Sequence, residues 1–352
     1  MSDQPVLTPI RPGHEFDVDA LAQFLRSRTT GFEGPIAVRQ FEGGQSNPTF
    51  LLACDGREYV LRKQPPGELL PSAHQVDREY RVMAALQDTD VPVPRMIALG
   101  EDPKIMGTKF YVMEKIDGRV LTDLQLPGLS KADRTAVYMD LVSVLAKLHR
   151  VDYEAVGLAD FGKPGNYYAR QISRWSRQYE ASKTEEIEAM NRLMEWLPAN
   201  IPPSEETCIA HGDYRLGNVI LHPTEPRIVA VLDWELCTLG HPLADLGYLC
   251  QDYHSPGYEG QGLGALPDLE AHGIPTEAQI LERYCAETGR DGIENWTFYL
   301  AYNLFRSAAI IQGVYKRGLD GNASSATALD YKEMCRNRSE LAWSLVEAAG
   351  EA

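Results

Sequence analysis

Short strand-like runs and long helical patterns occupy different parts of this 352-residue chain. Between residues 36 and 114, short apolar runs are separated by turn residues, with one amphipathic helix at about 75–86. From residue 121 onward, apolar residues mostly recur at helical spacing. Strands and helices that are segregated in this way favour an α+β fold over an alternating α/β fold.

The first part of the chain predicts a small sheet. Its strands are expected at 36–41, 49–54, 58–62, 93–99 and 109–114. Asp55-Gly56 separates the second run from the third, and Asp-Gly between alternating apolar residues is a strong hairpin signal. Residues 1–16 contain three prolines and little periodicity, so we expect an extended arm there, followed by a helix through Leu25.

The rest of the chain predicts a mainly helical region. Helices are expected at about 130–150, 167–181, 185–197, 276–288, 293–316 and 327–348. A β-like insert interrupts them at 208–210, 219–221 and 228–232. The predicted division is an N-terminal arm and helix (1–30), an N-lobe (31–116) and a C-lobe (117–352).

Charge and composition exclude several classes of protein. The chain has 34 Lys+Arg and 50 Asp+Glu, a formal net charge of −16, which argues against nucleic-acid or anionic-membrane partners. We find no signal-peptide pattern and no apolar stretch of membrane-spanning length. The six cysteines have no metal-site spacing and are expected to be buried free thiols in a reducing compartment. These features predict a cytoplasmic location.

A polar loop carries the strongest chemical signal. The stretch HGDYRLGN, residues 211–218, lies between two apolar runs, and Asp233 ends the next apolar run. A hairpin of this length would bring Asp213, Asn218 and Asp233 toward one point. Hard oxygen ligands of this kind suit Mg²⁺ bound to phosphate. A carboxylate that does not bind the metal can accept a proton from a hydroxyl.

HGDYRLGN followed by LDWE resembles the HxDxxxxN…D signature of aminoglycoside phosphotransferases and choline kinase-like enzymes. The resemblance covers roughly residues 30–340, with its parts in the family's order. It implies a two-lobed protein-kinase-like fold, with a small β-rich N-lobe and a larger, mainly helical C-lobe. It also implies transfer of the γ-phosphate of ATP, with Mg²⁺ as cofactor, to an alcohol group of a small molecule.

The resemblance also implies roles for individual residues. Asp213 would orient the acceptor hydroxyl and take its proton, while Asn218 and Asp233 would hold Mg²⁺. The nucleotide contacts lie in the segments GGQSN, YVLRK, REYRVM and YVMEKIDG. They are Gly43, Gly44, Ser46, Arg62, Glu79, Glu114 and Ile116.

Three further positions leave alternatives open. Strand alternation sends Arg62 and Lys63 to opposite faces, and we prefer Arg62 as the phosphate-binding base, with Lys63 as the alternative. His211 is expected to pack and hydrogen-bond within the loop, with a direct part in the chemistry as the alternative. Asp245 is expected either to cap a helix or to brace the catalytic loop.

The acceptor is suggested by a narrower resemblance. LRKQPPG, RQISRWSRQY and LDWELCTLGHPLADLGYL resemble the kinase-like domains associated with acyl-CoA dehydrogenases. Members of that branch have been linked to phosphorylation of 4-hydroxyacyl-CoA, which implies a hydroxyacyl-CoA acceptor and a separate dehydrogenase partner. Four basic residues near one helix are either CoA contacts or plain surface: Arg170, Arg174, Arg177 and Lys183.

Other functions remain open from the sequence. The charge of −16 suits a cationic acceptor, so an aminoglycoside or amino-sugar kinase is an alternative. A non-catalytic nucleotide-binding pseudokinase module is another, although the joint presence of Asp213, Asn218 and Asp233 argues against it. A metal-dependent hydrolase or a zinc site lacks the histidine spacing that such sites require.

Overall fold

The computed structural model describes residues 6–42, 47–67, 74–256, 262–321 and 327–352. The chain forms two compact units. The first comprises residues 1–121, 154–158 and 216–237, and the second comprises residues 122–153, 159–215 and 238–352. The segment 216–237, which contains Asn218 and Asp233, therefore packs with the sheet-containing part of the chain.

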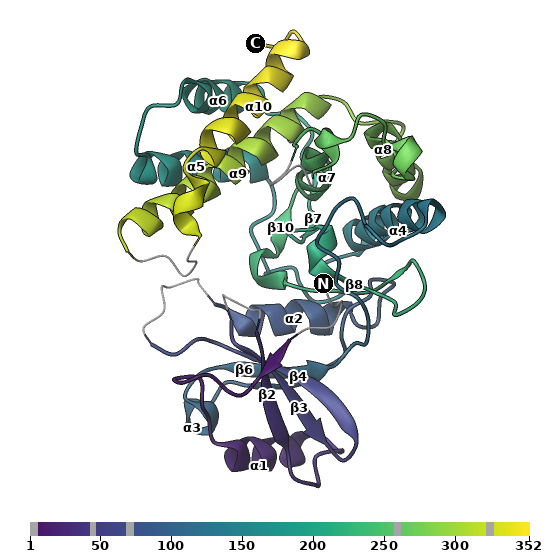
Figure 1. Ribbon diagram of the computed structural model, residues 1–352, viewed down its shortest axis with the longest axis vertical. Coiled ribbons are helices and arrows are strands. Elements are labelled where there is room, and N and C mark those ends of the chain that lie inside the picture. Colours follow the sequence, from purple (N-terminus) through teal and green to yellow (C-terminus); the bar gives the residue numbers. More distant parts are fainter. Residues whose placement is uncertain (1–5, 43–46, 68–73, 257–261, 322–326) are drawn as a thin grey trace. The chain divides into compact units, whose positions relative to one another are not determined.

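The first unit is built on a six-stranded antiparallel sheet in the order β1-β2-β3-β4-β6-β5 (Figure 1). Its strands are β1 (Leu7–Thr8), β2 (Ala37–Phe41), β3 (Thr49–Cys54), β4 (Arg57–Lys63), β5 (Met96–Gly100) and β6 (Phe110–Glu114). Its helices are α1 (Val18–Arg28), α2 (Val76–Leu86) and α3 (Pro103–Met106). The predicted Asp55-Gly56 turn is present, and both residues have positive φ, as in a type I′ hairpin.

One strand was not predicted from the sequence. β1 lies in the proline-containing arm, and its Leu7 and Thr8 pair with Phe41 and Gln40 of β2. A two-residue strand is too short to show an alternating pattern, so only its partner makes it recognisable.

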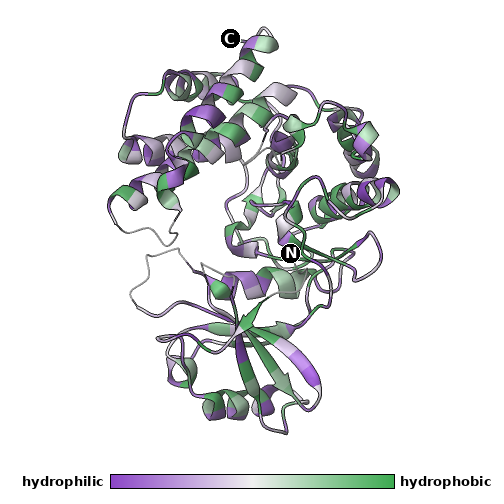
Figure 2. Cartoon of the chain, in the orientation of Figure 1, coloured by the Kyte–Doolittle hydropathy of each residue, from purple (hydrophilic) through white to green (hydrophobic). Residues whose placement is uncertain are grey.

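Strand alternation gives the sheet two buried faces. Leu21 and Leu25 of α1 pack with Phe50, Leu52 and Leu61 of the strands. The alternate residues of β4 face the other way, where Arg62 meets Glu79 of α2. Figure 2 shows hydrophobic residues along the strands, as expected for a sheet covered on both sides.

The segment 216–237 adds the short helices η1 (Leu216–Asn218) and η2 (Trp234–Leu236) and the antiparallel strands β8 (Val219–Leu221) and β9 (Ile228–Val231). Backbone hydrogen bonds of 2.8 Å join Arg119 to Leu221 in both directions, and Val231 N–H donates to Pro92 O at 2.8 Å. Gly118 allows this close approach, because a Cβ there would lie 2.3 Å from the carbonyl oxygen of Leu221.

The second unit is mostly helical. Its helices are α4 (Lys131–Arg150), α5 (Tyr167–Ser182), α6 (Glu188–Ala199), α7 (Pro242–Cys250), α8 (Glu277–Thr288), α9 (Trp296–Leu319) and α10 (Met334–Ala348). Short helices η3 (Gln251–Tyr253), η5 (Leu263–Ala265), η6 (Glu270–His272) and η7 (Ala328–Tyr331) join them, with a strand pair β7 (Cys208–Ala210) and β10 (Thr238–Gly240). α9 packs against α5, α6, α7 and α10.

The predicted α+β class is confirmed. The predicted helix at 327–348 is divided, since η7 ends at Tyr331 and α10 begins at Met334. Within the described part of the chain, no helix combines the length and the apolar composition needed to cross a membrane.

Candidate functional site

The strand β4 and the helix α2 bring a basic and an acidic residue together in the first unit. Nε of Arg62 lies 3.1 Å from Oε2 of Glu79, whose side chain is almost fully buried. Asn47 Nδ2 donates to one carboxylate oxygen of Glu79 and the hydroxyl of Tyr111 donates to the other, both at 3.0 Å. Burial raises the pKa of Glu79 against the opposing pull of Arg62. The carboxylate is therefore fixed by three partners.

The same guanidinium reaches the predicted metal-binding Asp. Nη2 of Arg62 donates to Oδ1 of Asp233 at 3.1 Å. Burial opposes the charge on Arg62, but Glu79, Asp233 and Glu235 together outweigh it and raise the pKa of Arg62. Asp233 has φ 64° and ψ 58°, a left-handed conformation that Asp adopts more readily than most residues, and this turns the chain sharply between β9 and η2.

Lys63 lies on the opposite face of β4. Its side chain is 3% exposed, and its ammonium lies 5.5 Å from the ring centroid of Phe16. Burial lowers the pKa of Lys63. The structure thus brings Arg62, and not Lys63, together with Glu79 and Asp233.

The two predicted metal ligands lie on neighbouring backbone segments of the first unit. Asn218 ends η1 and is 6% exposed, and its carbonyl accepts the N–H of Leu232 at 2.8 Å. Asp233 follows directly. One carboxylate and one amide oxygen suit Mg²⁺, which keeps water and phosphate oxygens among its ligands. Among the described residues, no three His, Cys, Asp or Glu side chains form a metal-binding group.

Two of the remaining predicted nucleotide contacts, Glu114 and Ile116, lie at and just after the end of β6. Glu114 ends β6, and its N–H donates to Arg95 O at 2.9 Å, with Ile116 two residues beyond. Gly43, Gly44 and Ser46 lie outside the described residues. The role of these three residues as nucleotide contacts therefore stays a prediction.

The predicted catalytic loop belongs to the second unit, where Asp245 of α7 braces it. Oδ2 of Asp245 accepts the N–H of His211 at 2.6 Å, and Oδ1 accepts that of Gly212 at 2.8 Å. His149 Nε2 lies 3.2 Å from Oδ2, and the hydroxyl of Tyr284 lies 2.7 Å from Nδ1 of His149. Burial alone would raise the pKa of Asp245, but the hydrogen bond and charge of His149, with the loop's donors, hold it below its usual value. Of the two roles considered for Asp245, the bracing role fits, because the α7 cap is His241.

Asp213 itself is held but accessible. Its N–H donates to Nδ1 of His211 at 3.2 Å, and its carboxylate, 22% exposed, lies 3.6 Å from Nε of Arg215. His211 is fully buried, in keeping with the structural role expected of it. The hydroxyl of Tyr214 donates to Leu141 O at 2.8 Å and anchors the next residue of the loop.

The basic residues near α5 differ in what they contact. Arg170 donates to the carbonyls of Gly165 and Lys163, and Lys183 pairs with Glu180 and Glu186 at 3.0 and 2.9 Å. These two side chains are therefore engaged locally. Arg174 lies over the ring of Trp175 at 5.0 Å.

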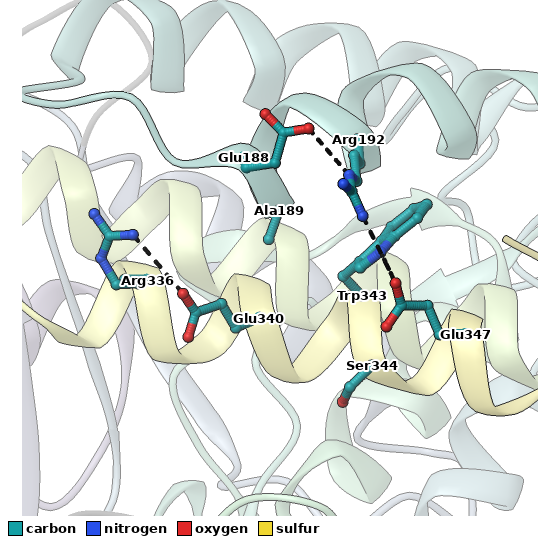
Figure 3. A pocket seen from close by; sticks show the side chains of 8 residues that line it. All are labelled: Glu188, Ala189, Arg192, Arg336, Glu340, Trp343, Ser344 and Glu347. Atoms are coloured by element: carbon teal, nitrogen blue, oxygen red, sulfur yellow. Dashed lines mark hydrogen bonds and ion pairs between the residues drawn. The ribbon is translucent and has the colours of Figure 1, made fainter.

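A shallow pocket of about 300 Å³ lies between α6 and α10 (Figure 3). Its arginines are paired: Arg192 with Glu188 at 3.0 Å and Glu347 at 3.6 Å, and Arg336 with Glu340 at 3.8 Å. None of the predicted site residues lines it. It is a separate surface feature of the second unit.

The amino-acid sequence matches a known protein family. The sequence model of the phosphotransferase enzyme family matches residues 37–282. The chain belongs to this family.

Acyl-CoA dehydrogenase family member 10 of Mus musculus is 44% identical over 354 residues, covering 98% of this chain and 33% of that protein. Acyl-CoA dehydrogenase family member 11 of Homo sapiens is 43% identical over 91% of this chain and 42% of that protein. The chain thus spans less than half of these relatives' length.

Solved structures agree on the fold. A Ralstonia eutropha protein, solved as a candidate aminoglycoside phosphotransferase, has a TM-score of 0.88 and 50% identity, covering 95% of this chain and 99% of that one. A thermostable mutant of aminoglycoside phosphotransferase APH(4)-Ia, in ternary complex with AMP-PNP and hygromycin B, has a TM-score of 0.60 at 17% identity, covering 93% of this chain and 98% of that one. The expected kinase-like fold of aminoglycoside phosphotransferases is confirmed.

Sequence reasoning missed several supporting residues. Asn47 follows the sequence GGQS and resembles a turn residue, and Tyr111 resembles a core residue of a strand, yet both donate hydrogen bonds to Glu79. His149 lies 96 positions from its partner Asp245, so no local pattern connects them. The one signal in the sequence was that His149 is a polar residue on the apolar face of the helix predicted at about 130–150.

Proposed function

We propose that this chain transfers the γ-phosphoryl group of MgATP to a hydroxyl of a small molecule, with a hydroxyacyl-CoA as the acceptor class. The observation that best supports this is the guanidinium of Arg62, which joins Glu79 to Asp233 in a member of the phosphotransferase family. A buried base held by a buried acid is the arrangement that positions phosphate oxygens in kinase-like enzymes.

The chain's own residues then have distinct roles. Arg62 binds phosphate oxygens through its remaining N–H groups, and Glu79 holds the guanidinium in place. Asn218 and Asp233 hold Mg²⁺, which neutralises charge on the phosphates when bound. Asp213 accepts a hydrogen bond from the acceptor hydroxyl and takes its proton as the phosphoryl group moves.

The nucleotide contacts outside this group follow from the same proposal. The main-chain groups of Glu114 and Ile116 would bind adenine, and the loop with Gly43, Gly44 and Ser46 would cover the phosphates. A cytoplasmic location and a dehydrogenase partner also belong to the proposal. The names of the relatives support that partner, because an acyl-CoA dehydrogenase name accompanies each relative cited above.

An aminoglycoside or amino-sugar acceptor is the second candidate. It is favoured by the net charge of −16, which attracts a cationic acceptor. A structural neighbour that binds hygromycin B shares the fold at 17% identity. A nucleotide-binding module without catalysis is the candidate from another class.

An acceptor screen with MgATP tests the proposal, with 4-hydroxyacyl-CoAs, aminoglycosides, choline-like alcohols and sugars assayed side by side. We expect Asp213→Asn to lower transfer by about 100-fold or more while the MgATP-induced thermal shift persists. Asp233→Asn should lose that shift. The exposed Asp291→Asn is the matched control and should retain both properties.

Each outcome separates the candidates. Transfer to aminoglycosides but not to acyl-CoA would select the second candidate. MgATP binding without transfer to any acceptor would select the non-catalytic module. Normal transfer by Asp213→Asn would contradict the mechanism.

A further inference from the structure

The buried carboxylate of Glu79 is oriented by two neutral donors. Asn47 Nδ2 donates to Oε1 of Glu79 and the hydroxyl of Tyr111 donates to Oε2, both at 3.0 Å. Nε of Arg62 also lies 3.1 Å from Oε2, but this N–H has no directed hydrogen bond to any of the described residues. Because an ion pair depends mainly on distance and a hydrogen bond on direction, Asn47 and Tyr111 set the orientation of the carboxylate.

The side-chain amide of Asn47 is itself fixed at both ends. It is fully buried. Because an ionised carboxylate only accepts hydrogen bonds, the amide nitrogen must face Glu79 and the amide oxygen must face away from it. Nδ1 of His74 lies 3.0 Å from that oxygen, so the proton of His74 that faces Asn47 is on Nδ1. A flipped amide would lose both hydrogen bonds.

The backbone around Asn47 is attached to the central strands of the sheet. Thr49 Oγ1 donates to the carbonyl of Asn47 at 3.1 Å, and the N–H of Lys63 donates to the carbonyl of Pro48 at 3.0 Å. Thr49 begins β3, and Lys63 ends β4 directly after Arg62. Asn47 therefore connects α2 to the end of the strand that carries Arg62.

The orientation of Glu79 affects the direction in which the guanidinium of Arg62 points. Nε of Arg62 faces Glu79, and Nη2 donates to Oδ1 of Asp233 at 3.1 Å. Because a guanidinium is planar and rigid, these two contacts define the directions of its remaining N–H groups. Arginine binds phosphate through parallel N–H groups, so those directions decide how well it binds.

We propose that Asn47 is a positioning residue for the phosphates of the nucleotide, which holds the Glu79 carboxylate in one orientation and, through it, the guanidinium of Arg62. The inference rests on the proposed function for the phosphates that Arg62 binds. A guanidinium that is held in place before binding contacts phosphate without first losing the freedom of its own side chain.

Asn47→Leu tests this role, because it removes the amide and nearly keeps the side-chain volume. We expect the Kd for MgATP to rise about 10-fold, since one hydrogen bond to a charged group is lost. The Kd for adenosine, which carries no phosphate, should change less than about twofold. A variant that merely loosened the fold would weaken the binding of both ligands alike.

Tyr111→Phe is a second test that does not depend on the folding of Asn47→Leu. It removes the other directed donor to Glu79 and keeps the ring, so it should also weaken MgATP and spare adenosine. Thr49→Val is the matched control, because it removes a hydrogen bond to the backbone of Asn47 and leaves the side-chain amide in place. Both dissociation constants should stay the same in this control.

A further measurement needs no nucleotide. In ¹⁵N relaxation NMR, the Nε–H signal of Arg62, assigned with Arg62→Lys, reports how freely the guanidinium moves. Its order parameter should be about 0.85 in the wild type and in Thr49→Val, as in a rigid group, and should fall below about 0.6 in Asn47→Leu.

The outcomes keep the two proposals apart. An unchanged order parameter in Asn47→Leu, an unchanged Kd for MgATP, or an equal loss of MgATP and adenosine binding overturns the positioning role. If the order parameter falls but the wild type binds MgATP no more tightly than adenosine, Asn47 does hold Arg62, and the proposed function is wrong.

Discussion

A single guanidinium joins one of the predicted nucleotide residues to a predicted metal ligand. Arg62 contacts Glu79 and Asp233 at 3.1 Å and lies 3.8 Å from Glu235. The next residue, Lys63, has the same formal charge but lies against Phe16 on the other face of the sheet. Adjacent basic residues therefore have opposite energetic roles, because Arg62 neutralises the buried carboxylate of Glu79, whereas Lys63 buries its own charge.

This difference predicts unequal effects of the same substitution. Arg62→Met removes the counter-charge of the nearly buried Glu79 and should lower the free energy of unfolding by about 3 kcal/mol. Lys63→Met exchanges a buried amine for an apolar side chain of similar length and should change it by less than about 1 kcal/mol. Denaturant unfolding of the two variants measures both values.

A double variant provides the internal check. Glu79→Gln removes the carboxylate that Arg62→Met leaves uncompensated, so Arg62→Met/Glu79→Gln should be more stable than additivity predicts. Equal destabilisation by Arg62→Met and Lys63→Met would contradict the assignment of Arg62 as the paired base.

At the scale of elements, α7 carries several functions within nine residues. Nδ1 of His241 accepts the N–H of Leu243 at 3.2 Å and caps the helix, while Asp245 accepts two backbone N–H groups of the predicted catalytic loop. His241 is 2% exposed, and its Nε2 has no hydrogen-bond partner within the described residues. A cap that accepts through Nδ1 needs that nitrogen unprotonated.

The His241 cap predicts a pH-dependent stability. Burial lowers the pKa of His241 from 6.5 to about 4. Between these pH values the unfolded chain binds the proton and the folded chain does not, so stability falls as the pH drops from about 6.5 to about 4. The full loss from this group is about 3 kcal/mol. His241→Asn, which still caps but does not titrate, should lose correspondingly less stability between pH 7 and pH 4 in thermal unfolding.

His241→Phe separates the two effects of this residue. It removes both the titration and the cap, so it should be less stable than His241→Asn at pH 7 but show the same reduced pH dependence. If the three proteins lost stability in parallel on acidification, another group would be responsible for the acid sensitivity.

Sequence patterns predicted the helices and strands better than the hydrogen bonds that polar side chains make between them. The Asp55-Gly56 hairpin and the long helix after Ser130 appear as predicted, because turn residues, caps and apolar periodicity act locally. The bracing of His211 by Asp245 spans 34 positions and that of Glu79 by Asn47 spans 32, and no periodicity records such pairs. The catalytic roles of Asp213, Asn218 and Asp233 stay predictions.

At the scale of the whole molecule, the two compact units divide the predicted site residues between them. Asn218 and Asp233 belong to the unit that contains Arg62, and Asp213 belongs to the other, although only five positions separate Asp213 from Asn218. The sequence does not show this division, because it depends on the pairing of 216–237 with Pro92 and Arg119, far earlier in the chain. The net charge of −16, by contrast, is a property of the whole chain and sets its long-range field.

That field predicts how salt affects acceptors of different charge. At about 10 mM salt the screening length is about 30 Å, and at about 150 mM it is about 8 Å, so added salt removes long-range repulsion and attraction alike. With saturating MgATP, kcat/KM for an anionic hydroxyacyl-CoA should rise about threefold between these conditions, and that for a cationic aminoglycoside should fall. A neutral sugar acceptor is the control, and its kcat/KM should not change with the salt concentration. A fall in kcat/KM for the acyl-CoA would show that local cations, such as the exposed Arg174 and Arg177 of α5, outweigh the net charge at the acceptor's approach.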